Sequence, residues 1–472
     1  MNQQKNKMSA FFIVVAIAFI APLFGGLSDA YAVPAFARQT GMECAACHVG
    51  SFGPQLTSFG RAFKLNAYSL DAGNDKPSTL SPDGQKTLKE YLQGLSAMAF
   101  GGYEHTNGDL RRGTELTGNQ QRLGTNNDFT LDQVSLFYGG QVFSHVGMLA
   151  QATYSNPNES FGWDQADLRY ANNTQIDGKP LIYGVMLNNN PSVQDVWNTT
   201  PAWGFPYVTS ALMPDISPTA APFITTLGLK VGGAGVYGMW NDWLYAELTG
   251  YTTLPDSAQR TLGQLNAHEN DHLSKIAPYW RLALQHDFGP HYVEVGTYGI
   301  AADRYPGNMQ GIGTDKFLDY AADATYQYTT GKHSISVYAS ALHEHANLDA
   351  SVAATTASNL TDSLTSLNAN IAYYYNNTYG LTFKPFSITG SSDLALYGNG
   401  VNNKPNSAGW TLQADYTPFG TSDSFAYPYL NMRFFVQYTA YTKFNGLGNN
   451  YDGLGRNASD NNLLFTGVWF AF

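Results

Sequence analysis

The sequence is poor in charged residues and has almost no cysteine. Charged side chains make up 13% of its 472 residues, about half the share of an ordinary soluble protein, and there are 2 cysteines. After residue 32, no stretch approaches the roughly 18 consecutive apolar residues of a membrane-spanning helix, which excludes a helical membrane protein. The chain also offers no catalytic triad, no glycine-rich phosphate loop and no basic patch. We therefore expect no hydrolase, nucleotide-binding or nucleic-acid-binding chemistry.

The first 32 residues have the pattern of an export signal. A short basic start at Lys5 and Lys7 precedes an almost wholly apolar stretch over residues 10–24. The segment closes on Ala30-Tyr31-Ala32, with small residues at both positions that a signal peptidase recognises. We place cleavage before Val33. An uncleaved anchor is the alternative, although the apolar run is short for a bilayer span.

The chain is rich in aromatic residues and glycine. Aromatic residues make up 14% of the chain, Tyr alone accounts for 31 residues, and there are 47 glycines. From about residue 91 onward, apolar and polar residues alternate with a period of two, which is the pattern of β-strands. In the segment YWRLALQ, Trp280, Leu282 and Leu284 share one face, whereas Arg281 and Gln285 share the other. One face suits lipid and the other suits water, as in transmembrane β-barrels.

The alternating segments follow one another to the C-terminus. Long and short links alternate between them, beginning with a long loop up to residue 126 and a short turn at Ser144-His145, as in bacterial outer-membrane barrels. The last residues, LLFTGVWFAF, resemble the terminal strand of such barrels, with an edge strand of a soluble sandwich as the alternative. The sequence therefore predicts an all-β fold, a 16-stranded antiparallel outer-membrane β-barrel, with strands near 91–105, 127–143, 146–157, 163–172, 180–188, 225–240, 243–254, 273–288, 291–304, 316–330, 333–348, 363–375, 378–390, 407–417, 429–446 and 462–472.

Charged residues on the predicted lumen faces are mixed in sign, which suits a packed polar interior as well as an open pore. A barrel of this strand number is wide enough to hold a lumen plug. The predicted lumen-facing charges are Asp167, Arg169, Glu247, Arg281, Glu294, Asp319, Asp323 and Arg433.

One connection, residues 189–224, is long, rich in proline and without clear alternation. A structureless link of this length is normally functional or disordered. Trp197, Trp203 and Phe205 give it a composition unlike that of a disordered segment. We expect it either to fold inward and constrict the lumen or to form an ordered outer cap.

Two smaller pieces precede the barrel, which we assign to residues 91–472. They are residues 33–70, which contain both cysteines, and a polar linker over residues 71–90. In the first piece, Pro54 can begin a helix on which Leu56, Phe59 and Phe63 form an apolar stripe. Because this piece is too small for a core of its own, we expect something else to cover the stripe.

Residues 44–48, CAACH, have the spacing of a c-type haem attachment site. Cys44 and Cys47 would bond to the two vinyl groups of the porphyrin, and His48 would be the proximal ligand of the iron. The alternatives are a disulfide, a zinc site and a thioredoxin-like motif. A zinc site would need a second pair of Cys or His ligands, which the sequence does not offer. A thioredoxin-like motif would need an α/β fold around it, which the strand pattern does not predict. We predict one covalent haem c, with the apolar stripe packed on its porphyrin and the whole segment plugging the lumen.

The sixth ligand of the iron is not evident within the haem segment. Between His48 and residue 97 there is neither Met nor His, and Met42 lies too near Cys44 to reach across the ring. The iron is then either five-coordinate or completed by a residue of the barrel. The candidates, each of which can also be an ordinary barrel residue, are Met98, His105 and Met186.

The chain resembles the fused outer-membrane cytochrome-porins, a family that includes the iron-oxidising outer-membrane cytochromes. The resemblance rests on ARQTGMECAACH, FGRAFKLNAYSL, SLFYGGQVFSHVGMLAQATYS and NNNPSVQDVWNTTPAWGFPY, and it weakens toward the C-terminus. It implies a single haem segment joined to a 16-stranded barrel. It also implies uptake of electrons from extracellular Fe(II) and their delivery inward to a periplasmic c-type cytochrome.

We therefore predict an electron-transfer protein of the bacterial outer membrane, an oxidoreductase only in the sense of oxidising Fe(II). Its haem segment would lie on the periplasmic or lumen side, and lipid would surround the barrel. The net charge of −11 would draw cations toward the mouth. Two alternatives stay open: a diffusion porin whose haem-bound plug gates or stabilises the channel, and electron export to extracellular acceptors. Uptake and export differ in the potentials of the partners, so the sequence does not separate them.

Overall fold

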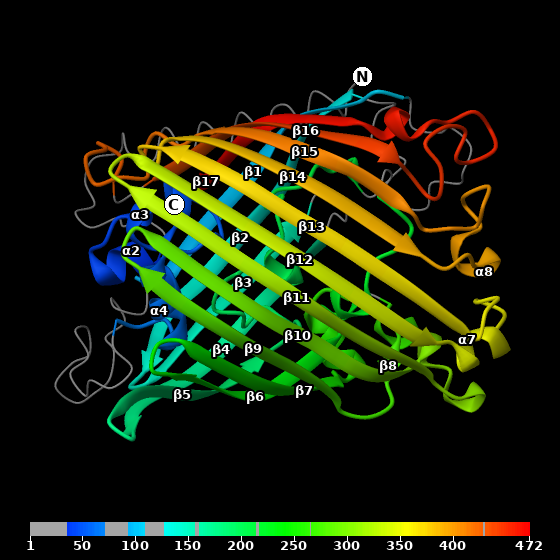
Figure 1. Cartoon of the computed structure of the whole chain (residues 1–472), viewed down its shortest axis with the longest axis horizontal. Coiled ribbons are helices and arrows are strands. Elements are labelled where there is room, and N and C mark those ends of the chain that lie inside the picture. The colour runs from blue at the N-terminus through cyan, green and yellow to red at the C-terminus, as the bar shows by residue number, and fades with distance from the viewer. Residues whose placement is uncertain are drawn as a thin grey trace.

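The described part of the chain forms a closed antiparallel β-barrel (Figure 1). This computed structural model describes residues 35–70, 93–108, 127–155, 160–213, 217–264, 266–427 and 430–472. The predicted signal peptide, residues 1–32, and the predicted linker, residues 71–90, lie outside the described residues. Among the described residues, no helix has both the length and the apolar character needed to cross a bilayer.

Each long strand pairs with its sequence neighbours, and β1 pairs with β17 to close the ring. The two-residue strand β8 lies on the same edge of β10 as β9, so the two together form one position of the wall. The wall therefore has 16 positions among the 17 strands, which confirms the predicted strand number. The strands are β1 (Leu95–Thr106), β2 (Asn127–Phe143), β3 (Val146–Ser155), β4 (Ser160–Ile176), β5 (Lys179–Asn188), β6 (Val231–Trp240), β7 (Leu244–Thr253), β8 (His272–Leu273), β9 (Ala277–Phe288), β10 (His291–Tyr305), β11 (Asp315–Thr330), β12 (His333–Asn347), β13 (Thr361–Tyr375), β14 (Tyr379–Gly390), β15 (Ser407–Tyr416), β16 (Asn431–Lys443) and β17 (Leu463–Ala471).

The two faces of the wall separate as the alternation predicts. On β9, Leu282 and Leu284 are 48% and 43% exposed on the outside, whereas Arg281 and Ala283, which alternate with them, are 1% exposed each and face the lumen. All eight predicted lumen-facing charges are buried. An apolar outer face and a polar interior are what a barrel needs when lipid surrounds it.

The two ends of the barrel differ in the length of their connections. At one end the strands are joined by tight turns such as Gly289-Pro290 and Gly331-Lys332, and at the other by long loops that contain α7 and α8 (Figure 1). The turn end has one longer segment, residues 417–430, between β15 and β16. Exposed tyrosines gather on the outer wall toward the turn end, as in the aromatic girdle of a membrane barrel: Tyr326, Tyr373, Tyr375, Tyr379 and Tyr416.

Short helices lie in the N-terminal segment, residues 35–70, and in the loops. The helices α2, α3 and α4 lie at the turn end of the barrel, opposite α7 and α8 (Figure 1). The helices of the N-terminal segment are α2 (Ala35–Thr40), α3 (Cys44–Cys47), η2 (Val49–Ser51) and α4 (Ser58–Leu65). Those of the loops are η4 (Pro201–Trp203), η6 (Phe223–Thr226), α6 (Asp256–Thr261), η7 (Ala267–Glu269), η8 (Pro306–Asn308), η9 (Gln310–Ile312), α7 (Asp349–Ala353), α8 (Leu394–Tyr397) and η10 (Ala458–Asn461).

Several predicted boundaries differ from those of the structure, and two of the differences have a clear cause. The helix expected to begin near Pro54 begins at Ser58, because the Thr57 side chain caps it by accepting from the backbone N–H of Gly60. The strand expected from residue 225 begins at Val231. The preceding residues form η6, and the spacing of Ile224 and Leu227 buries both side chains within the barrel.

Candidate functional site

The CAACH sequence folds into one turn of helix with its functional side chains directed to a common space. Cys44 and Cys47 are the first and last residues of α3, and residues three apart lie on the same side of a helix. His48 leaves the helix in extended conformation, while its backbone N–H donates to the carbonyl of Cys44 at 2.8 Å. Both thiols and the imidazole line one cavity of ≈ 470 Å³. Pockets that hold small molecules and cofactors have volumes on the order of 300–1,000 Å³.

Helix α4 and its N-cap residue, Thr57, pack against the CAACH turn. The backbone N–H of Thr57 donates to the carbonyl of Cys47 at 3.0 Å, and its hydroxyl donates to the carbonyl of Ala46 at 2.5 Å. Gly60 lies so close to Cys47 that a Cβ atom there would be 2.2 Å from the Cys47 carbonyl oxygen. The FGRAF sequence therefore holds α4 against α3 at a distance that only glycine permits.

Burial sets the protonation of the three site residues. It raises the pKa of the Cys44 thiol and of the Cys47 thiol to about 11 each. A disulfide-exchange motif needs a lowered thiol pKa, so the thioredoxin-like alternative is disfavoured. Burial lowers the pKa of His48 to about 4, which keeps the imidazole neutral and able to bind a metal ion. The two cysteines do not form a disulfide in the structure.

The imidazole of His48 lines the cavity, and the backbone of Gln55 and that of Gly53 lie within reach of the ring. A histidine that binds a metal through one ring nitrogen is usually oriented by a hydrogen bond at the other. Among the described residues, no three His, Cys, Asp or Glu side chains are placed to hold a metal ion together. A haem iron differs from such a site because the porphyrin supplies four of its ligands, so a single histidine can suffice on the proximal side.

The rest of the cavity wall is largely apolar and comes from three parts of the chain. Two of the three residues of the predicted apolar stripe, Leu56 and Phe63, line it, whereas Phe59 does not. An apolar lining of this kind fits a flat hydrophobic ring system. The barrel wall contributes Met98, Phe137, Leu149 and Trp469, and the loop after β5 contributes Trp203, Pro206 and Tyr207.

The structure distinguishes the three candidates for the sixth ligand. Met98 lines the cavity together with His48. Met186 faces the lumen as expected but is buried against Leu65 and Trp197, outside the cavity lining. His105 lies near the long-loop end of β1, where it hydrogen-bonds to Asn127 at 2.8 Å. The fold therefore brings Met98 to the site, but neither Met186 nor His105.

Sequence reasoning missed the residues that cover the CAACH turn from the C-terminal part of the chain. The backbone N–H of Ser422 donates to Glu43 at 2.8 Å, and the hydroxyl of Tyr427 donates to the carbonyl of Gly41 at 3.2 Å. Asn431 donates to the carbonyl of Ser51 at 2.8 Å. The only signal in the sequence was the length of the link between β15 and β16, which is unusual for the turn end of the barrel.

The N-terminal segment contacts the lumen-facing side chains of several strands. The hydroxyl of Tyr68 donates to Asp167 at 2.5 Å, and the hydroxyl of Tyr237 donates to the carbonyl of Leu65 at 2.8 Å. Arg61 donates to Gln327 at 2.8 Å and stacks 3.6 Å from the ring centre of Tyr292. These contacts come from β4, β6, β10 and β11, so residues 35–70 touch four strands of the wall.

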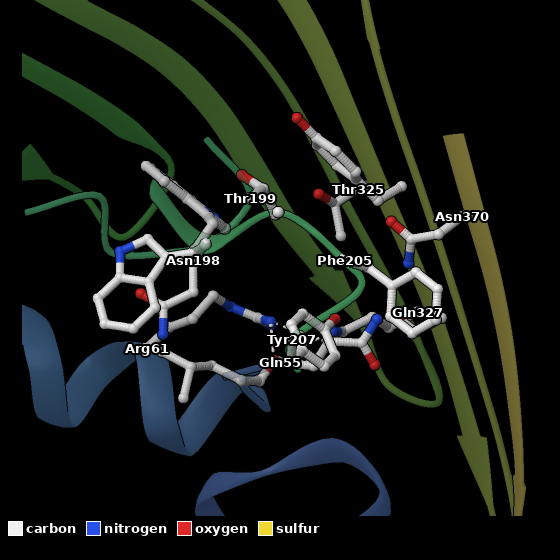
Figure 2. A pocket seen from close by; sticks show the side chains of 15 residues that line it. Gln55, Arg61, Asn198, Thr199, Phe205, Tyr207, Thr325, Gln327 and Asn370 are labelled. Carbon is white, nitrogen blue, oxygen red and sulfur yellow. Dashed lines mark hydrogen bonds between the residues drawn. The ribbon is translucent and has the colours of Figure 1, made fainter. Parts of the chain in front are cut away.

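The long loop after β5 folds inward, as one of the two predicted alternatives states. Lys64 reaches it with three hydrogen bonds, to the carbonyls of Val193 and Asp195 at 2.8 and 2.6 Å and to the Asn198 side chain at 2.6 Å. Figure 2 shows Arg61, Asn198 and Gln327 around a pocket between the segment, the loop and the wall. The volume of this pocket, ≈ 20 Å³, is enough for about one water molecule.

Charged side chains of the wall also bind the loop after β5. Asp195 pairs with Arg281 at 3.1 Å, and Arg281 pairs with Asp323 at 2.9 Å and with Glu294 at 3.1 Å. Asp319 accepts from the backbone N–H of Ile224 at 2.8 Å. Each of these charged groups has a partner, so they fasten the loop to the wall of the barrel.

Comparison with known proteins gives a likeness at the level of the barrel. No family model matches the chain, and no curated protein matches it. Similar solved structures include OmpT, an outer membrane protein of Vibrio cholerae, at 10% identity and a TM-score of 0.40, covering 80% of this chain and 96% of that chain. The outer membrane channel DcaP of Acinetobacter baumannii is similar at 10% identity and a TM-score of 0.43, covering 80% of this chain and 96% of that chain. Salmonella typhi OmpF is similar at 14% identity and a TM-score of 0.43, covering 80% of this chain and 97% of that chain. Likeness at this level carries no information on function.

Proposed function

We propose that this protein is an outer-membrane barrel that transfers electrons through one c-type haem held on Cys44, Cys47 and His48. The observation that carries the proposal is their convergence on a single, largely apolar cavity of ≈ 470 Å³ inside a closed barrel. A bound c-type haem supplies a one-electron redox centre with a tunable potential. The spacing of the two thiols and the neutral imidazole are what covalent attachment and iron ligation require.

The location in the outer membrane is supported by the wall of the barrel. A closed barrel leaves no strand edge unpaired, which is the condition for a β-structure in lipid. The outward residues are apolar across the middle of the strands, and tyrosines gather on the outside toward the turn end. Export of the chain would rest on the signal predicted for residues 1–32.

We further propose extracellular Fe(II) as the electron donor and a periplasmic c-type cytochrome as the acceptor. The N-terminal segment lies at the turn end, which faces the periplasm in bacterial barrels, and the long loops lie at the opposite end. The inward loop and the N-terminal segment occupy the lumen between them. The iron would therefore remain outside while the electron passes inward. Electron export would use the same site in the reverse direction.

The residues of the chain have distinct tasks in this function. Cys44 and Cys47 anchor the ring and fix its position relative to the barrel. His48, held neutral by burial, binds the iron. The aromatic and aliphatic lining, including Phe63 and Trp203, would surround the bound ring with apolar groups and lower the local dielectric, which adjusts the potential.

The test uses the full chain purified in detergent. The protein should contain one haem per chain with the pyridine haemochrome spectrum of two thioether bonds, and Fe(II) should reduce it. The double variant Cys44→Ala/Cys47→Ala should lose the covalent haem. Absence of haem from the wild-type chain would overturn the proposal, and a haem that Fe(II) does not reduce at any pH would remove iron as the donor.

A diffusion porin is the second candidate, and the barrel architecture itself favours it. In this function the haem would only fix the N-terminal segment in the lumen. Planar-bilayer conductance separates the two: a large open-channel current with a haem that exchanges no electrons would support the porin. A chain with low conductance and a redox-active haem would support electron transfer.

A further inference from the structure

We infer that Met98 is the sixth ligand of the haem iron and that Trp469 positions it across the closing seam of the barrel. The inference rests on the proposed haem function and deepens it. Met98 is the one of the three candidate ligands that shares a cavity with Cys44, Cys47 and His48. It reaches the cavity from strand β1 of the wall, whereas His48 reaches it from the N-terminal segment.

The sulfur of Met98 has a specific hydrogen-bond donor. The indole Nε1–H of Trp469 donates to the Met98 Sδ atom at 3.1 Å. A thioether sulfur has two lone pairs and is a soft ligand that suits haem iron, as in cytochromes with a Met/His pair. One lone pair can bind the iron while the other accepts from the indole, which restricts the rotation of a flexible side chain.

Trp469 is in turn fixed from both sides. Its ring meets that of Phe52 edge-on at 4.7 Å, and Phe52 follows His48 by four residues in the N-terminal segment. It also packs against Phe100 of β1 at 6.4 Å, and 8% of the residue is exposed. Because Phe52 belongs to the His48 side and Phe100 to the Met98 side, the indole aligns the two ligand-bearing parts of the chain.

The ligand pair depends on closure of the barrel. In the pairing of β1 with β17, Phe100 lies opposite Trp469 and Met98 lies opposite Ala471. Met98 and Trp469 are therefore diagonal neighbours across the first and last strands, which meet only when the ring closes. Six-coordinate haem iron should therefore be observed only in chains whose barrel has closed.

The indole also affects the potential. A hydrogen bond to the Met98 sulfur withdraws electron density from it and makes the sulfur a weaker electron donor to the iron. A weaker donor destabilises ferric iron relative to ferrous iron. Trp469 should therefore favour the reduced haem. Removing the indole N–H should lower the reduced-to-oxidised ratio at a fixed ambient potential, with a tenfold change equal to 59 mV for one electron.

The experiment compares the haem-loaded full chain with Met98→Leu, Trp469→Phe and a matched control, Met186→Leu, which alters another buried, lumen-facing methionine outside the cavity. Leucine keeps the volume of methionine and removes the sulfur. Wild type and Met186→Leu should be low-spin with a sulfur-to-ferric-iron charge-transfer band. Met98→Leu should lose the band and bind carbon monoxide at least tenfold faster. Trp469→Phe should keep the band and lower the reduced-to-oxidised ratio about threefold or more.

Two outcomes overturn the inference and leave the proposed function standing: a covalently attached haem whose band and carbon monoxide kinetics are the same in Met98→Leu as in wild type, or a wild-type haem that is five-coordinate. A wild-type chain without covalent haem overturns both. If Met98→Leu does not form a heat-modifiable barrel, Trp469→Phe decides, because a reduced-to-oxidised ratio equal to that of wild type would contradict the assigned contact.

Discussion

Gly60 of α4 lies directly against the backbone carbonyl of Cys47, where a Cβ atom would be 2.2 Å from the oxygen. No real Cβ atom tolerates this distance from backbone, so the substitution Gly60→Ala must displace α4 or α3. Overpacking of a well-packed contact costs about 1–3 kcal/mol. We expect Gly60→Ala to lower the haem content per chain and to make residues 35–70 more sensitive to protease.

The matched control for this prediction is Gly311→Ala. No heavy atom lies within 4 Å of a Cβ built on Gly311. This variant should keep the haem content and protease resistance of the wild type. Equal behaviour of Gly60→Ala and Gly311→Ala would show that the contact between α3 and α4 does not position the CAACH turn.

Arg281 contacts three buried carboxyl groups of the lumen, those of Asp195, Glu294 and Asp323, at 2.9 to 3.1 Å. Removal of one partner from a buried charge cluster costs roughly 3–5 kcal/mol, because the remaining charges lose their compensation. Arg281→Met should therefore release the loop after β5 from the wall. We expect a rise in single-channel conductance in planar bilayers, whereas Arg260→Met, which alters an exposed residue of α6, should leave it unchanged. A conductance equal to that of wild type would show that Arg281 does not hold the lumen closed.

Leu282 faces outward from β9 and is 48% exposed. If lipid covers this face, an arginine there meets hydrocarbon, at a cost of about 2–4 kcal/mol near the bilayer midplane. Leu282→Arg should fold into lipid vesicles with lower yield and unfold at lower urea concentration. Leu454→Arg, in the loop between β16 and β17, changes a residue that is 75% exposed and should behave as wild type. Tolerance of both variants would contradict the membrane-facing assignment.

Asp393 joins two long loops at the end opposite the N-terminal segment. Its carboxylate accepts from the backbone N–H groups of Ser358 and Asn359 at 2.7 Å each, and from those of Ala395 and Leu396 at 2.9 Å each. Burial acts to raise its pKa, but these four donors hold the pKa of Asp393 below its usual value. The carboxylate therefore contributes stability above the unfolded pKa of about 3.9, and this stability is lost as the pH falls through the lower folded pKa.

Asp393→Asn should reduce hydrogen-exchange protection of the amides of residues 358–359 and 395–396 at pH 7, because the amide side chain loses the charge and one acceptor. The difference from wild type should shrink as the pH falls through the lowered pKa of the wild-type carboxyl. Asp349→Asn, at an exposed position of α7, serves as the control. A difference that stays constant from pH 7 to pH 2 would show that the charge of Asp393 is not what joins the loops.

Local patterns were sufficient for most of the barrel. A period of two decides which side chains face outward and which face inward, because successive residues of a strand point to opposite faces. The lumen position of Arg281 and the outward position of Leu282 follow from this rule alone. The rule fails at Ile224 and Leu227, where the apolar residues are buried by the inward loop and belong to no strand.

The sequence by itself determined the strands, the two faces of the wall and the spacing of Cys44, Cys47 and His48, since each depends on residues near one another in the chain. Only the tertiary structure decided that the loop after β5 turns inward and that Met98, rather than His105 or Met186, shares the cavity with His48. The contact between Met98 and Trp469 joins residues 371 positions apart. No local pattern encodes such a pair, because it exists only once the first and last strands close the ring.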